Sequence, residues 1–83
     1  MSKHEDELVE LHKFVDELGE EMKHRLVKKY YDNFRGWDNP DFRDQFKARA
    51  MNAILEGKFI DAMNFCGMVH MIDKNQKEQD GDV

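Results

Sequence analysis

The stretch that decides the fold is Asn33-Phe34-Arg35-Gly36-Trp37-Asp38-Asn39-Pro40, an aromatic turn that interrupts an otherwise helical pattern. Gly36 and the only proline of the chain end the helix that precedes them, because glycine and proline are the poorest helix formers. Asn39 followed by Pro40 has the form of an N-cap and the first residue of a new helix. This stretch therefore predicts two helices that meet at a turn.

On the N-terminal side of the turn, apolar residues recur at gaps of three and four, the period of one helical face. The capping-box pattern of Ser2 and Glu5 predicts a helix that starts near residue 3 and runs to Asp32, roughly 45 Å long at 1.5 Å per residue. Gly19 is expected to mark either a kink or the close approach of another helix. The apolar positions are Leu8, Leu11, Val15, Leu18, Met22, Leu26, Tyr30 and Phe34.

On the C-terminal side, two shorter helices are expected, with Gly57 as the C-cap of the first. The second, from about residue 58 to residue 73, is apolar almost all round and is therefore expected to be the central helix. Residues 74–83 are polar and lack periodicity, which predicts a disordered tail after a single helical domain of residues 1–73.

The long helix extends past the two short ones, so its N-terminal half needs a cover for Leu8, Leu11 and Val15. A second copy of the chain is the simplest cover. The expected fold is therefore all-α: a long N-terminal helix plus a helical hairpin, in a three-helix bundle completed by homo-oligomerisation. The expected assembly is a homodimer or larger, with the acidic N-terminal halves exchanged or packed together.

The composition excludes several classes of protein. The chain has 83 residues, a net charge of -5 and one cysteine, Cys66, so it holds no intrachain disulfide and no cysteine-based zinc site. No apolar run is long enough to cross a membrane, and the acidic balance argues against binding of duplex nucleic acid. A cytoplasmic location, in a bacterial host if the chain is encoded by a phage, is the expectation.

The charge alternates along the chain. Residues 1–22 carry eight acids and two bases, a balance of -6, and residues 23–49 carry eight bases and four acids, a balance of +4. Residues 50–83 carry six acids and three lysines, a balance of -3. This layout fits head-to-tail pairing of molecules, an anion pocket in the middle, or simply solvated helix faces.

The middle segment mixes cations with aromatic side chains around the turn. Cations bind phosphates and aromatic faces stack on bases, so this segment favours a nucleotide ligand. The alternative is that its aromatic residues only close the open end of the helical bundle. The candidate ligand-binding residues are Lys28, Lys29, Tyr31, Arg35, Trp37, Arg43, Asp61 and Asn64.

Asp61 and Asn64 stand out because they are polar residues three apart on the most apolar helix. A buried carboxylate must be paired, hydrogen-bonded or bound to a metal. Asp61 is thus expected either to pair with a core-facing Lys or Arg, with Asn64 capping a backbone group, or to contact a ligand or metal. Glu17 and Glu20 have the same spacing, which would present two carboxylates to one Mg²⁺, but Glu-x-x-Glu is common on solvated helices and is a weak signal alone.

The turn Arg35-Gly36-Trp37-Asp38, together with Asp61, Asn64, Phe65 and Met68 in the pattern Asp-x-x-Asn-Phe-x-x-Met, resembles a group of small phage proteins. That group is similar to MazG-like all-α nucleoside triphosphate pyrophosphohydrolases, including the N-terminal part of phage dATP/dGTP diphosphohydrolases. The likeness spans roughly residues 14–73. It implies a helical dimer in which pairs of carboxylates hold Mg²⁺ and activate water on a nucleotide phosphate.

The chain departs from that pattern at the metal ligands. Glu17 and Glu20 precede the turn, the helix after it reads Phe46-Lys47-Ala48-Arg49 without a carboxylate pair, and the last ligand is the neutral Asn64. Because lost acids weaken Mg²⁺ binding, the resemblance favours binding over turnover.

The expected function is a small, non-catalytic phage-type accessory protein without a cofactor. Its ligand is expected to be a nucleotide or nucleotide signal, sequestered from a host defence system. One alternative is an inhibitor that binds a host protein through its acidic helix. Another is a Mg²⁺-dependent pyrophosphohydrolase whose metal set is Glu17, Glu20 and Asp61, with Asn64 beside it.

Overall fold

The structure is a computed structural model that describes the backbone of residues 3–80 and the side chains of residues 6–77. Within residues 3–80 every regular element is helical. These elements are the helix α1 (Lys3–Tyr31), a short 3-10 helix η1 (Pro40–Phe42), and the helices α2 (Arg43–Leu55) and α3 (Phe59–Asp80). The prediction of an all-α fold is confirmed, with the three helices in the expected order.

Helix α1 runs unbroken from Lys3 to Tyr31, as the apolar spacing predicts. The helix is continuous through Gly19, and no neighbouring atom lies within 4 Å of the position that a Cβ on Gly19 would occupy. No other element of the described chain therefore approaches α1 at this glycine. Ser2, the first residue of the predicted capping box, lies outside the described residues.

The turn between α1 and α2 is built by residues that tolerate unusual backbone angles. Asn33 has a φ of 71° and Gly36 a φ of 78°, both in the left-handed region. At Gly36 a Cβ would also lie 3.0 Å from the ring of Phe42, so only glycine fits there without a shift. The Asn39 side chain accepts a hydrogen bond of 2.9 Å from the backbone N–H of Asp41. Asn39 is therefore the N-cap of η1, which begins at Pro40 and leads directly into α2.

Helix α3 is longer than the sequence predicts. The apolar pattern stops at Asp73, but the helix continues to Asp80. The added stretch is Lys74-Asn75-Gln76-Lys77-Glu78-Gln79-Asp80, which contains neither glycine nor proline, and Lys, Gln and Glu are good helix formers. The part of the predicted disordered tail that the structure describes is thus helical, and residues 81–83 lie outside the described residues.

The core lies between α2 and α3. Its largest feature is an aromatic cluster in which the ring of Phe46 lies 5.7 Å from that of Phe65 and 5.8 Å from those of Phe34 and Phe42. Of the seven apolar side chains that are buried in the described part of the chain, three are alanines, so the core is thin. The seven are Phe46, Ala50, Ala53, Ala62, Phe65, Met68 and Ile72.

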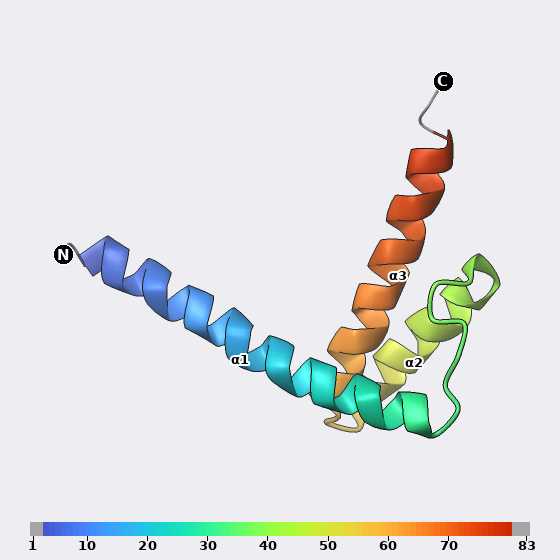
Figure 1. Cartoon of the computed structure of the whole chain (residues 1–83), viewed down its shortest axis with the longest axis horizontal. Helices are drawn as coiled ribbons and strands as arrows, with labels where there is room; N and C mark the ends of the chain where they lie inside the picture. Colours follow the sequence, from blue (N-terminus) through green and yellow to red (C-terminus); the bar gives the residue numbers. More distant parts are fainter. Residues whose placement is uncertain (1–2, 81–83) are drawn as a thin grey trace.

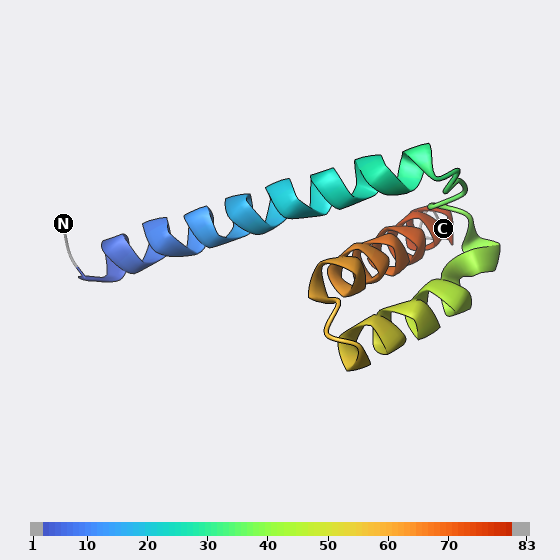
Figure 2. The same cartoon turned by 90° about the horizontal axis from the view of Figure 1, so that it is seen from below.

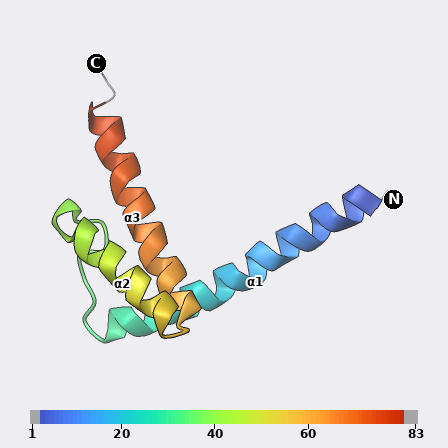
Figure 3. The same cartoon turned by 180° about the vertical axis from the view of Figure 1, so that it is seen from behind.

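Helix α3 is central, as predicted, because it contacts both α2 and α1, while α1 and α2 form no contact pair among the described residues. In Figure 1, α2 and α3 lie side by side as a hairpin, and α1 crosses the lower end of that hairpin and leaves it at a wide angle. Figure 3 shows the same arrangement from behind, and Figure 2 shows from below that α3 lies between α1 and α2.

The N-terminal part of α1, residues 6–21, is called the arm here. Every side chain from Asp6 to Glu17 is exposed, because the arm extends away from the hairpin (Figure 1). The arm nevertheless carries large apolar side chains, with Leu8 55% and Val15 61% exposed. None of the described helices is both long enough and apolar enough to cross a membrane.

Candidate functional site

A groove lies in the inner corner between α1 and α3, with a volume of about 400 Å³. Its walls are apolar and partly aromatic, and only one lining side chain, Asn64, is polar apart from the Tyr30 hydroxyl and the Trp37 indole N–H. The lining residues are Met22, Leu26, Tyr30, Phe34, Trp37, Asn64, Gly67, Met68 and Met71. This set is called the α1–α3 groove below.

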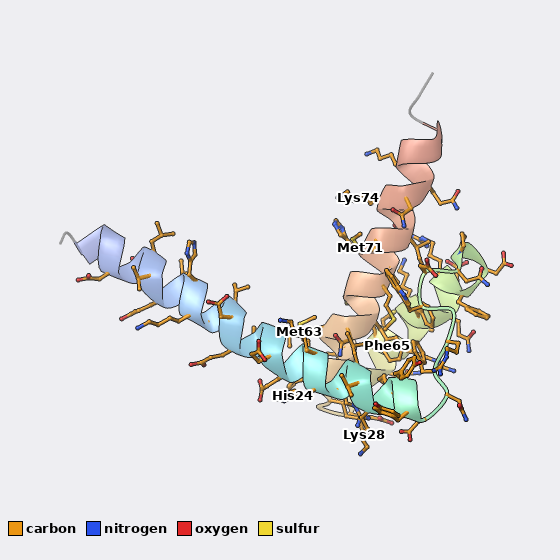
Figure 4. All side chains as sticks on the ribbon, in the orientation of Figure 1. His24, Lys28, Met63, Phe65, Met71 and Lys74 are labelled. Atoms are coloured by element: carbon orange, nitrogen blue, oxygen red, sulfur yellow. The ribbon has the colours of Figure 1, made fainter. Side chains whose placement is uncertain are left out.

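Both walls of the groove follow from the helical period. On α1, Met22, Leu26 and Tyr30 are four residues apart and so stand above one another on one face. On α3, Met71 and Lys74 lie on the side that faces the open angle between the two helices (Figure 4). The apolar stripe of α1 therefore continues from the groove outward along the arm, and a lysine lies beyond the apolar wall of α3.

Asn64 is the polar centre of the groove. Its side chain is only 3% exposed, and its Nδ2 donates a hydrogen bond of 3.3 Å to the backbone carbonyl of Met22. This is the backbone contact that the sequence offered as one alternative for Asn64. The Oδ1 atom of the same amide is buried and accepts no hydrogen bond from any described residue. A buried acceptor of this kind lowers the stability of the fold, because it has lost its hydrogen bonds to water without gaining one from the protein.

Asp61 is used to join the two helices. Nε of Arg25 donates to its Oδ1 at 2.7 Å, Nη2 of Arg25 donates to its Oδ2 at 3.2 Å, and Nζ of Lys29 lies 3.8 Å from Oδ1. The hydrogen bonds from Arg25 hold the pKa of Asp61 below its usual value, and the nearby charge of Lys29 acts in the same direction. Pairing with a basic residue, one of the two alternatives for Asp61, is therefore what the structure shows.

Two further cations of the middle segment, Arg35 and Arg43, also have partners. Nη1 of Arg35 donates to the carbonyls of Tyr30 and Phe34, and its guanidinium lies 3.9 Å from the centre of the Tyr30 ring. Arg43 donates from Nε and Nη2 to the carboxylate of Asp73. These contacts use donors that a phosphate would need.

The structure thus distributes the eight predicted ligand-binding residues over several places. Trp37 and Asn64 line the same groove. Lys29 and Asp61 instead take part in the ion pairs that join α1 to α3. Lys28 and Tyr31 are exposed on α1. Arg35 lines a second hollow of about 220 Å³ beside Arg49, and Arg43 is paired with α3.

The residues of the enzyme alternative do not meet. Within the described residues, no group of three or more His, Cys, Asp or Glu side chains is placed to hold a metal ion. Glu17 and Glu20 are exposed on the arm, where Glu20 lies 3.4 Å from Lys23, while Asp61 is bound by Arg25. The structure therefore does not assemble Glu17, Glu20 and Asp61 into one site.

Two groove residues, Trp37 and Asn64, were predicted as ligand-binding residues, and four others were predicted only as part of the apolar stripe of the first helix. The spacing of Met22, Leu26, Tyr30 and Phe34 placed them on one stripe, and that stripe was the available signal. The spacing does not specify the angle between α1 and α3. This angle leaves Met22, Leu26 and Tyr30 only partly covered. Arg25 was missed as the partner of Asp61, because nothing in the local sequence links two residues so far apart.

Comparison with family models, with curated protein sequences and with solved structures finds no match to this chain.

Proposed function

We propose that this chain is a non-catalytic protein-interaction module whose α1–α3 groove binds an amphipathic α-helix. The observation that carries the proposal is the groove itself, a hollow of about 400 Å³ with apolar and aromatic walls. Helix-in-groove binding relies on such walls, because anchors spaced three and four residues apart enter a hydrophobic channel. Methionines suit this task because their flexible, polarisable side chains adapt to the partner.

The charges around the groove support a helix that is acidic on its polar face. From Met22 to Tyr31, α1 carries four bases, Lys23, Arg25, Lys28 and Lys29, and no acid. Arg25 and Lys29 are paired with Asp61, and Lys23 lies 3.4 Å from Glu20, so four bases beside two carboxylates leave this region with a net positive charge. An acidic helix meets attraction on entry, and a basic one meets repulsion.

The test uses Trp37, which lines the groove and is the only tryptophan, so its emission reports the occupancy of the site. Amphipathic helical peptides with acidic, neutral and basic polar faces are titrated into the full chain. We expect a saturable blue shift of the emission, strongest with the acidic peptide. A matched pair of variants localises the signal: Leu26→Asp changes the groove wall and abolishes the shift, whereas Val27→Asp, on the next residue and another face of α1, leaves it.

A chain whose Trp37 emission responds to none of these peptides would contradict the proposal. Equal loss of the shift in both variants would also contradict it, because binding would then not depend on the groove. Circular dichroism of each variant confirms that helical content is retained.

Binding of a nucleotide is the second candidate. The observation that favours it is the smaller hollow of about 220 Å³, where Arg35 and Arg49 lie beside Asn33 and Gln45. Guanidinium groups bind phosphate oxygens well. The same titration carried out with linear and cyclic nucleotides separates the candidates, since nucleotide binding is lost in Arg49→Glu and retained in Leu26→Asp.

A further inference from the structure

We infer that the helix that fills the α1–α3 groove is the arm of a second copy of this chain, bound in antiparallel orientation and in a reciprocal exchange. The inference rests on the proposed function, since it names the occupant of the same groove. Three independent features of the structure lead to it: the shape of the apolar stripe, the distribution of charge along α1, and the open space at Gly19.

The apolar stripe of α1 consists of two halves, and neither half is covered within one chain. The C-terminal half, Met22, Leu26 and Tyr30, forms one wall of the groove and lacks a helix to fill it. The N-terminal half, with Leu8 and Val15, is exposed and lacks a groove. Each half spans roughly 10–15 Å at 1.5 Å per residue. The N-terminal half of one α1 is therefore about as long as the groove wall that the C-terminal half of another α1 forms.

The charges of α1 select the antiparallel orientation. Residues 6–21 hold seven acids and one base, Lys13, whereas residues 22–31 hold four bases and no acid. When two copies of α1 lie antiparallel and centred near residue 17, residues 6–12 of each arm, which hold three acids and no base, lie along residues 22–28 of the other, which hold three bases and no acid. In a parallel pair the acids would face acids along the whole arm. Lys74, on the wall of α3 that faces the open angle, adds a further base near the expected path of the partner's arm (Figure 4).

Gly19 provides the point of closest approach. At 100° per residue, Leu8, Val15, Gly19 and Leu26 fall within roughly 60° of one another around the helix. Because nothing lies within 4 Å of a Cβ on Gly19, this face of α1 is open there. An antiparallel pair centred near residue 17 places Val15 opposite Gly19 of the partner subunit and Leu8 opposite Leu26 of the partner subunit. A side chain thus enters the gap that each glycine leaves.

Because the core of one chain is thin, burial of further apolar side chains in a dimer would stabilise the fold. Among the side chains of residues 6–77, only four large apolar ones are buried within one chain, Phe46, Phe65, Met68 and Ile72. Chains of this size with so little core usually gain stability from oligomerisation, a metal or disulfides. The arm's apolar side chains are buried only if a second molecule covers them, and a two-fold exchange covers both arms at once.

Sedimentation equilibrium of the full chain is the first part of the test. We expect a dimer, with twice the 9.9 kDa mass of one chain. Val15→Glu places a carboxylate at the centre of the interface and is expected to weaken association at least about 100-fold. Val9→Glu is the matched control, because it makes the same change on a different face of the same helix, and it is expected to leave the dimer intact.

Disulfide trapping tests the orientation without relying on a destabilised variant. In a Cys66→Ser background, copies with Leu8→Cys are mixed with copies with Leu26→Cys. The antiparallel exchange predicts a dimer with a disulfide between position 8 of one copy and position 26 of the other. A disulfide between position 8 of both copies in its place would show a parallel pair and overturn the inference. A chain that stays monomeric up to about 1 mM would also overturn it.

These outcomes also separate the inference from the proposed function. A monomeric chain whose Trp37 emission still responds to an acidic helical peptide retains the helix-binding groove and refutes the self-exchange. A dimer that is insensitive to both Val15→Glu and Leu26→Asp associates through another surface, which refutes the inference. If that dimer's Trp37 also ignores every peptide, both proposals fail.

Discussion

The guanidinium of Arg25 on α1 donates hydrogen bonds to both carboxylate oxygens of Asp61 on α3, at 2.7 Å and 3.2 Å. This bidentate contact lies where the two helices cross, next to the α1–α3 groove. Two fixed bonds resist both sliding and rotation of α1 on α3. The pair therefore ties α1 to α3 at the crossing from which the arm leaves the hairpin.

Removal of Arg25 is expected to destabilise the chain. In Arg25→Ala, Asp61 remains largely buried and keeps only the more distant Lys29, so the free energy of unfolding falls by about 1–3 kcal/mol. Urea denaturation followed by circular dichroism measures the change. Lys23→Ala is the control, because Lys23 makes only an exposed ion pair with Glu20 and its loss is expected to cost less than about 0.5 kcal/mol.

The same pair predicts a dependence of stability on pH. The folded-state pKa of Asp61 is lowered from its ordinary value near 3.8 by the hydrogen bonds from Arg25. The stabilisation is therefore fully present above pH 3.8 and is lost as the pH falls through the lowered pKa. Urea denaturation of the native chain and of Asp61→Asn between pH 7 and about pH 2 tests this. The native chain is expected to lose more stability over this range, and equal losses would show that Asp61 does not contribute.

Asn64 is expected to respond oppositely to two substitutions of similar size. Asn64→Leu removes a buried amide oxygen without a partner and fills the site with apolar atoms, so thermal stability stays within about 1 kcal/mol of the native value or rises. Asn64→Asp places a charge in the same apolar corner, one helical turn from Asp61, and is expected to cost more than about 2 kcal/mol. Thermal denaturation of both variants provides the comparison, and a large loss in Asn64→Leu would show that the bond to Met22 dominates.

Two glycines with left-handed backbone angles are expected to differ in their tolerance of alanine. Gly57, with a φ of 77°, has no neighbour within 4 Å of a Cβ, so Gly57→Ala costs only the backbone penalty of about 1–2 kcal/mol. At Gly36 the added Cβ also lies 3.0 Å from the ring of Phe42, so Gly36→Ala is expected to cost more. Equal losses measured by thermal denaturation would mean that the Phe42 ring moves aside freely.

Local chemistry explains why much of the fold was predictable from sequence. The spacing of Leu8, Leu11 and Val15 identified α1, and Asn39 with Pro40 identified the start of the second helical segment, because both signals act within a few residues. The end of α3 was less predictable. After the apolar pattern stops at Asp73, helix propensity alone extends the helix, and residues 74–80 contain no glycine or proline to stop it.

The candidate site was less predictable because it depends on the angle between two helices. Trp37 and Asn64 were predicted as ligand-binding residues and do share the groove. Arg43 was grouped with them on composition, yet its guanidinium binds Asp73, thirty positions along the chain. Which cations remain available is decided by such long-range partners, and no local pattern reports them.

The most direct test of the exchanged arm is the emission of Trp37 as a function of protein concentration, measured alongside the sedimentation mass. The antiparallel dimer predicts that the emission shifts to the blue over the same concentration range in which the mass doubles. It also predicts that Val15→Glu keeps the red-shifted emission of an open groove over that range. A dimer that forms without any change at Trp37 would contradict the exchange, because the partner's arm would then lie outside the groove.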